Sequence, residues 1–354
     1  MSDPSPTPQI VIQQKESLFG RFGKFLLVAL LFAIVTIIGM QSSYKSYFNP
    51  TRGPQEKFHS GSETATKKIA IINVTGIISE ANTFYKAQID KVRKDEDVVA
   101  VVLRINSPGG TVTYSDYLHH HLREMVTGKS REGEAEGKEL PIVVSMGSVC
   151  ASGGYMLAMA VGDKPDTLIA EPATLTGSIG VILTHYDLSG LLDEWSIQDD
   201  SITSHDLKDM GSPTKTMTEE ERAIFQDLVD GMLVDFKETV MNGRPIFRDN
   251  PADLDAVATG QVFTAKQAVE LKLIDKIGFI EDALDRAAEL ANTKVDDVRC
   301  VRYDKPPAAL DALLGSAQTQ SRSLTIDIDS LLELSVPRAY YMCTWLPSVV
   351  KSGR

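Results

Sequence analysis

Residues 141–181 contain the feature that most constrains the fold, a serine placed between an apolar run and a helical pattern. The run at 142–144 is apolar and β-branched, which predicts a buried strand. It breaks into a turn of small residues at 147–154, and apolar residues at helical spacing begin at Tyr155. The sequence therefore predicts a strand, a turn and a helix in succession, with Ser152 at the turn.

Two glycines, Gly153 and Gly154, follow Ser152 and leave the backbone bare beside its hydroxyl. A substrate carbonyl could therefore approach the amides at the start of the helix, as acyl transfer requires. The structural alternative is that Ala151 and the two glycines only allow the helix to pack closely on the sheet. An A-S-G-G motif alone leaves both interpretations open.

Strand patterns alternate with helical patterns through the middle of the chain, which predicts an α/β domain with a largely parallel sheet. Thr218 and Glu221 have the spacing of a capping box, so a long helix should begin there. We expect strands at 67–79, 97–107, 142–146, 167–170, 178–184 and 297–303, and helices at 80–93, 113–126, 188–195 and 218–243, with two more within 259–292.

An uncharged apolar segment at 25–40 predicts a membrane anchor. With its flanking residues it reaches the roughly 20 residues needed to span about 30 Å of hydrocarbon. Arg21 and Lys24 precede it, so the positive-inside rule predicts a cytoplasmic N-terminus and an exported domain. The alternative is a cleaved signal peptide, but the long apolar core and the lack of an A-x-A site favour an uncleaved anchor.

The sequence divides into five segments: a cytoplasmic tail at 1–21, the anchor at 22–42, a polar linker at 43–66, a globular domain at 67–303 and a C-terminal tail at 304–354. A charged, Gly-rich insert at 127–140 predicts an exposed loop. The apolar stretch at 335–350 is too short and too interrupted by proline to span a bilayer.

Composition excludes several classes of function. The net charge of −12 and the lack of a basic block argue against a nucleic-acid partner. The three cysteines form no C-x-x-C motif, so neither a disulfide framework nor a zinc site is expected. The consecutive residues 119–121 are all histidine and should face different sides of their helix, so we expect no shared metal.

A serine nucleophile needs a base, and no G-x-S-x-G motif is present to identify one. His185 and His205 are candidates, although neither has a distinctive spacing. A lysine is the other option, provided that burial lowers its pKa from about 10.4 so that it is neutral. Lys208 lies in a loop before the long helix, and Ser178 could accept or donate a hydrogen bond to its amine. These residues alone leave histidine and lysine open.

Four ordered motifs resemble the signal peptide peptidase A family of membrane-bound serine proteases. They are R-I-N-S-P-G-G at 104–110, S-M-G-S-V-C-A-S-G-G-Y at 145–155, T-L-T-G-S-I-G-V at 174–181 and K-D-x-x-S-P at 208–213. The similarity covers about residues 68–290 and implies a crotonase-like (Clp protease-like) fold. Four motifs in consistent order are far more specific than any one of them.

The resemblance also implies a Ser/Lys dyad that needs neither metal nor cofactor. It implies peptide substrates, namely remnant signal peptides or other membrane-associated peptides, and assembly into homo-oligomers that in some members share the dyad between protomers. By this similarity Ser152 is the nucleophile, Lys208 the general base and Ser178 the residue that orients the lysine, and Gly109 or Gly110 pairs with Gly153 as the oxyanion hole.

The chain departs from the family pattern at Cys150, where a small residue such as alanine is usual, and at Lys272, where glycine is common. Neither residue belongs to the dyad. Two alternatives come from other functional classes: a crotonase-type acyl-CoA enzyme, which would have no use for an anchor, and a catalytically silent membrane scaffold. We expect a single-pass protease of the inner membrane with its catalytic domain on the exported side.

Overall fold

The computed structural model describes residues 18–48, 53–129, 137–305 and 339–343. The chain forms two units, Met1–Arg52 and Gly53–Arg354. The predicted tail at 1–21 falls largely outside the described residues, as do most of the insert at 127–140 and most of the tail at 304–354. Each unit is described by itself below.

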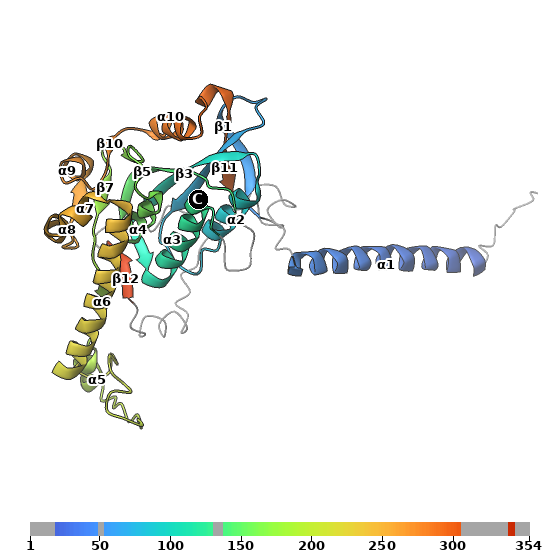
Figure 1. The fold of residues 1–354 in the computed structure, drawn as a ribbon. Coiled ribbons are helices and arrows are strands. Elements are labelled where there is room, and N and C mark those ends of the chain that lie inside the picture. Colours follow the sequence, from blue (N-terminus) through green and yellow to red (C-terminus); the bar gives the residue numbers. More distant parts are fainter. Residues whose placement is uncertain (1–17, 49–52, 130–136, 306–338, 344–354) are drawn as a thin grey trace, which may run out of the picture. The chain divides into compact units, whose positions relative to one another are not determined.

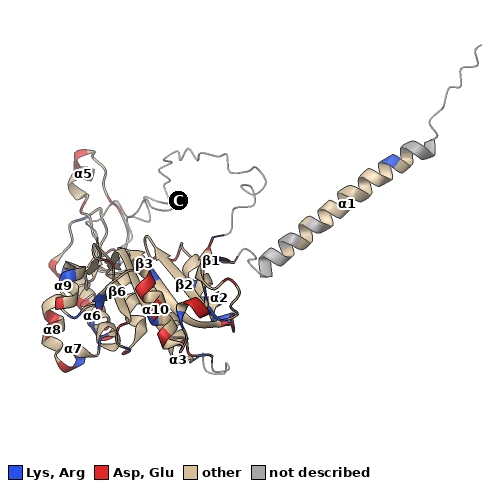
Figure 2. Ribbon diagram, turned by 90° about the horizontal axis from the view of Figure 1, so that it is seen from above, with Lys and Arg blue, Asp and Glu red and all other residues tan. Residues whose placement is uncertain are grey.

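The described part of the first unit is one helix, α1 (Leu18–Phe48), which covers the predicted anchor. Its span Phe22–Gln41 has 20 residues and a mean hydropathy of 2.4, which is long and apolar enough to cross a bilayer. Figure 2 shows the described residues of this span in tan except for one basic residue, which the sequence identifies as Lys24. Within this unit the described apolar side chains of α1 are exposed.

The second unit is built on a mostly parallel sheet with helices on both faces (Figure 1), which confirms the predicted α/β class. Its strand order is β1-β11-β2-β3-β5-β6-β10, and β7 pairs with both β5 and β9. The strands are β1 (Gln55–Gly61), β2 (Lys68–Thr75), β3 (Val98–Ser107), β5 (Ile142–Ala151), β6 (Leu168–Ala170), β7 (Leu175–Gly177), β9 (Val262–Thr264), β10 (Lys276–Ile277) and β11 (Arg299–Asp304).

Helices pack on both faces of the sheet because alternate residues of the central strands point to opposite sides. On one face Val101 and Leu103 join a core with α2 (Phe84–Lys94) and α3 (Val112–Thr127). On the other, Val102 packs with α10 (Ile280–Leu290). These strands are apolar on both faces, as buried parallel strands are.

The remaining described helices are short, except for α6. They are α4 (Gly153–Ala158), the 3₁₀ turn Met159–Val161, α5 (Ser189–Glu194), α6 (Glu219–Gly243), α7 (Ile246–Asp249), α8 (Pro251–Val257), α9 (Ala265–Glu270) and the 3₁₀ turn Val295–Asp297. The predicted capping box is confirmed, since the Thr218 hydroxyl accepts from the Glu221 amide at 3.2 Å. Helix α6 ends at Gly243, where the sequence places its end.

A second, three-stranded sheet has the order β4-β12-β8 and was not predicted. Its strands are β4 (Gly109–Thr111), β12 (Ala339–Met342) and β8 (Ile182–Leu183). The strand expected at 178–184 is therefore wrong in extent, because β7 ends before it and only β8 lies within it. Strand β12 lies in the segment predicted to be a tail, and β1 lies in the segment predicted to be a linker.

Candidate active site

Ser152 lies between β5 and α4 in a backbone conformation that non-glycine residues rarely adopt, with φ 52° and ψ −117°. Its amide donates to the Gly177 carbonyl at 2.8 Å, and its carbonyl accepts from the Met156 amide at 2.9 Å. A residue held in such a conformation costs about 1–3 kcal/mol and persists only where its surroundings fix it. The strand end and the first turn of α4 therefore hold this serine in place.

The Ser152 side chain is almost fully buried, with 1% of the residue exposed. Its Oγ has no hydrogen-bond partner in the described part of the chain. An unpaired buried hydroxyl is unfavourable by about 1–3 kcal/mol, so native proteins rarely keep one without a reason. A nucleophile that meets its partners only in a complex is such a reason.

Three glycines surround the space beside Ser152. The Gly109 amide, at φ +103°, already donates to Ser107 Oγ at 3.1 Å. A β-carbon on Gly153 would lie 3.2 Å from the Gly110 amide nitrogen, so those two residues approach each other closely. The resemblance predicted either Gly109 or Gly110 as the partner of Gly153 in the oxyanion hole. Of these two, Gly110 is the one whose amide does not donate to Ser107.

Ser178 follows β7 in the same way that Ser152 follows β5. The two strands are parallel, and Ala151 pairs with Gly177, so both serines come directly after paired residues. Ser178 also has a positive φ of 53° and is 6% exposed. Its amide donates to the Gln261 carbonyl at 2.7 Å. The structure therefore brings these two predicted site residues to the same edge of the sheet.

Lys208 lies elsewhere, in the loop between α5 and α6. It is exposed, and its amide donates to the His205 carbonyl at 2.9 Å. In Figure 1 the segment that carries α5 lies well away from α4. Because no described residue is hydrogen-bonded to the Ser152 hydroxyl, the predicted Ser/Lys contact is not formed within the described chain.

The two histidine candidates do not reach the serine either. His185 Nε2 lies 3.4 Å from the Ser212 carbonyl, and His205 Nδ1 accepts from the Leu207 amide at 3.3 Å. Both interactions lie within the segment between β8 and α6. The described residues of one chain therefore supply no base to Ser152.

The expectation for the histidines at 119–121 was wrong in part. His120 Nε2 lies 3.3 Å and His121 Nδ1 2.9 Å from the same Glu124 carboxylate, so these two do not face different sides. Arg93 also pairs with Glu124, at 2.8 Å, and its positive charge opposes a cation there. His119 lies outside this group of side chains, and burial lowers its pKa to about 4.

Ser115 was missed by the sequence analysis. It lies on α3, is fully buried, and its Oγ has no partner among the described residues. A β-carbon on Gly153 would lie 2.5 Å from this oxygen, so Ser115 borders the same space as Ser152. A serine inside a helical pattern gives no local signal that could have identified it.

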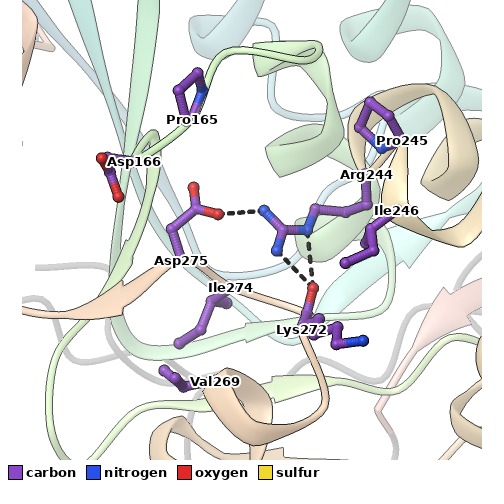
Figure 3. Close-up of a pocket in the computed structure, with 9 residues that line it drawn as sticks. All are labelled: Pro165, Asp166, Arg244, Pro245, Ile246, Val269, Lys272, Ile274 and Asp275. Carbon is purple, nitrogen blue, oxygen red and sulfur yellow. Dashed lines mark hydrogen bonds and ion pairs between the residues drawn. The ribbon is translucent and has the colours of Figure 1, made fainter.

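A pocket of about 350 Å³ lies apart from these residues (Figure 3). Arg244 crosses it and pairs with Asp275 and with the Lys272 carbonyl, the latter at 2.6 and 2.9 Å. Lys272 has φ 63°, a left-handed conformation that glycine adopts more readily. The contacts of Arg244 are internal to the fold, and none of the predicted site residues lines the pocket.

Comparison with known proteins supports the motif assignment. The sequence model of peptidase family S49 matches residues 134–294. A putative protease from Synechocystis is 33% identical over 249 residues, which is 70% of this chain and 83% of the relative. A putative signal peptide peptidase SppA from Enterococcus faecium is 31% identical over 73% of each chain. Protease 4 of Salmonella typhi is 32% identical over 67% of this chain and 35% of its own length. The predicted resemblance is confirmed.

Proposed function

The chain belongs to peptidase family S49, and we propose that it is a membrane-anchored serine endopeptidase that uses Ser152 as its nucleophile. The observation that carries this proposal is the buried, unpaired Ser152 hydroxyl on a strained turn. The hydroxyl makes no hydrogen bond with the described residues, so it is available to a carbonyl that enters beside the glycines. A nucleophile requires this access.

In the proposed reaction Ser152 Oγ attacks the carbonyl carbon of a peptide bond. The amides of Gly110 and Gly153 then donate to the oxyanion. The bond to the following residue breaks, the amine leaves with the proton of the serine, and water hydrolyses the acyl-enzyme. Gly109, at positive φ, contributes by having no side chain, which allows the close approach of strand β12 at Tyr341.

We propose Lys208 as the base and Ser178 as the residue that orients it. Because Lys208 is exposed on a loop apart from Ser152, we further propose that a second copy of the chain supplies it. Exposed apolar side chains near that loop support such an assembly. Trp195 is 67% exposed and Leu228 on α6 is 46% exposed, and such surfaces are typical of interfaces between subunits. The second copy would desolvate the lysine amine, as a neutral base requires.

Helix α1 supports membrane attachment, and we propose an orientation with the N-terminus in the cytoplasm and the catalytic domain exported. The substrates proposed on this basis are remnant signal peptides or other membrane-associated peptides. A relative whose name includes signal peptide peptidase, from Enterococcus faecium, supports this class. An anchor keeps the active site near such substrates, whereas an acyl-CoA enzyme has no use for one.

The test is labelling of the full chain with a serine-reactive peptidyl phosphonate, followed by mass mapping of the modified residue. We expect a single adduct on Ser152 and none in Ser152→Ala. The matched control is Ser178→Ala, which should label more slowly but on the same residue, because Ser178 orients the base and is not attacked. An adduct on another residue in the wild-type chain would refute the assignment, and a chain that never labels would favour the silent scaffold.

A further inference from the structure

Strand β5 carries a bulge shortly before the turn that holds Ser152. Met146 and Cys150 are both paired with the parallel strand β3, but between them β5 has residues 147–149 where β3 has only Asn106. Such a bulge bends its strand and increases its twist, and bulges are common next to active sites because they re-aim a side chain. The backbone at 147–149 therefore sets the direction in which β5 continues toward the nucleophile.

The bulge lies where β5 changes its second neighbour. Up to Met146 the strand pairs with β6, and from Val149 onward it pairs with β7. The pairing with β7 continues to Ala151, and the amide of Ser152 then donates to the Gly177 carbonyl at 2.8 Å. A shift of the bulge would thus move the residues that lie directly before the nucleophile.

Two side chains bind the backbone of the bulge. A bulge interrupts the regular ladder, so its buried backbone groups need other partners. The Val149 amide donates to Asn106 Oδ1 at 3.1 Å. The Thr174 hydroxyl, in the turn between β6 and β7, donates to the Gly147 carbonyl at 2.6 Å. These two hydrogen bonds hold the first and the last residue of the bulge.

Asn106 also joins the two strands on which the proposed reaction depends. It lies near the end of β3, which leads to Gly110, and its partner Val149 lies near the end of β5, which leads to Ser152. The hydrogen bond between Asn106 and Val149 therefore links the strand that carries the proposed nucleophile to the strand that leads to a proposed oxyanion-hole amide.

The Asn106 side chain lies on the other face of the sheet from helix α4. A β-carbon on Gly154 would lie 3.4 Å from Ile105 Cγ2 and 3.5 Å from Ser107 Cβ, so the neighbours of Asn106 on both sides face α4. Because side chains alternate between the faces of a strand, Asn106 points away from α4. It acts on the bulge and not on a substrate beside Ser152.

We propose that Asn106 and Thr174 are positioning residues, which fix the bulge of β5 and thereby the place of Ser152 relative to the oxyanion-hole amides. This inference rests on the proposed function. A nucleophile has to lie about 3–3.5 Å from the carbonyl carbon, and a displacement of about 1 Å can lower the rate about 100-fold. Loss of either hydrogen bond therefore slows the attack of Ser152 and leaves substrate binding nearly unchanged.

The test compares two replacements of Asn106 in the full chain. Asn106→Leu keeps the size of the side chain and removes the acceptor, so it should lower kcat for a quenched peptide by about 10- to 100-fold and change KM by less than about threefold. Asn106→Asp keeps an oxygen that accepts from the Val149 amide, so it should retain at least about a third of the wild-type kcat. The maximal rate of phosphonate labelling should follow kcat in both variants.

Thr174→Val tests the other side of the bulge with almost no change of shape. It should lower kcat by about 3- to 10-fold at nearly constant KM, and it carries the test if Asn106→Leu does not fold. The matched control is Ser145→Ala on β5. Ser145 is buried just before the bulge, but its hydroxyl accepts from Arg104 at 2.8 Å, so its loss should change kcat by less than about twofold.

Hydrogen exchange of backbone amides tests the bulge without a substrate. The Val149 amide should exchange at least about tenfold faster in Asn106→Leu than in the wild type, because its acceptor is lost. The Leu103 amide, in the middle of β3, should stay as protected as in the wild type. General destabilisation would raise exchange at both amides.

The outcomes separate the inference from the function on which it rests. Wild-type kcat in folded Asn106→Leu and Thr174→Val, equal losses in Asn106→Asp and Asn106→Leu, or a loss confined to KM would overturn the inference and leave the peptidase function intact. A wild-type chain that cleaves no peptide and forms no phosphonate adduct on Ser152 would overturn both. A fall in kcat at constant KM, restored by aspartate and accompanied by faster exchange at Val149, is the result that we expect.

Discussion

The amide of Ser152 donates a 2.8 Å hydrogen bond to the carbonyl of Gly177. This bond links the end of β5 to the end of β7 and thereby links the turn of Ser152 to that of Ser178. Two serines at positive φ, one after each of two paired strands, are therefore positioned by the backbone alone. The predictions below follow from this arrangement and from the residues that surround it.

The close approach of Ser115 to Gly153 gives a stability prediction. Gly153→Ala should lower the free energy of unfolding by about 1–3 kcal/mol, because its methyl group would lie 2.5 Å from Ser115 Oγ. Ser115→Ala should be neutral or slightly stabilising, since it removes an unpaired buried hydroxyl. The double variant should recover part of the loss, and urea unfolding of all four proteins measures the coupling. Strict additivity would contradict the contact.

His119 predicts a stability change in mild acid. Burial lowers its pKa to about 4 from the ordinary value of 6.5, and its Nε2 has no partner among the residues described. The unfolded chain therefore binds the proton of His119 more readily than the folded chain does. The contribution of the neutral imidazole to the free energy of unfolding is complete above pH 6.5 and is lost as the pH falls toward 4. The loss should reach about 3 kcal/mol at most.

His119→Gln should flatten this part of the pH–stability curve, and His120→Gln, at a 63% exposed side chain, is the control. Chemical denaturation between pH 4 and 7 measures both. An unchanged slope in His119→Gln would mean that another group causes the acid dependence.

The proposed base predicts the behaviour of Lys208 variants. Lys208→Arg should abolish peptide hydrolysis although it keeps the positive charge, because a guanidinium does not accept the serine proton. His205→Ala is the matched control on the same loop and should retain activity. The opposite pattern would identify histidine as the base.

Sharing of the dyad between copies is tested by mixing. Separately inactive Ser152→Ala and Lys208→Ala chains, dissociated and reassembled together, should regain part of the wild-type activity if each site draws its residues from two copies. No recovery in assembled mixtures would place both residues in one chain.

The anchor predicts a topology. Protease added to intact spheroplasts should degrade the domain that follows α1, because Arg21 and Lys24 precede the apolar span. Immunoblotting of the domain measures this, with lysed spheroplasts as the control. Protection of the domain in intact spheroplasts would mean the reverse orientation.

The sequence predicted the parts of the fold that have local signals. The β-branched runs correctly predicted β2, β3 and the start of β5. The spacing of Thr218 and Glu221 correctly predicted the start of α6. The extension of β5 through residues 147–151 was missed because small residues at 147–151 also suit a turn, and only pairing with β7 reveals a strand.

Other parts had no local signal. Strand β12 is four residues long and is stabilised by β4 and β8, which are distant in sequence, so no window around it could predict its pairing. Ser152 and the glycines could be named from motifs, because a turn needs particular residues at fixed spacing. The burial of Tyr341 could not be predicted, since Phe236 and Met232 contact it only through the packing of α6.

The central claim is that Ser152 is the nucleophile, and turnover of a quenched peptide by Ser152→Ala tests it most directly. We expect kcat to fall by at least about 10³-fold, because the methyl group of alanine cannot attack the carbonyl carbon. The midpoint of thermal unfolding should stay close to that of the wild type, since the hydroxyl makes no hydrogen bond with the described residues that could be lost. A folded Ser152→Ala chain with wild-type turnover would contradict the account.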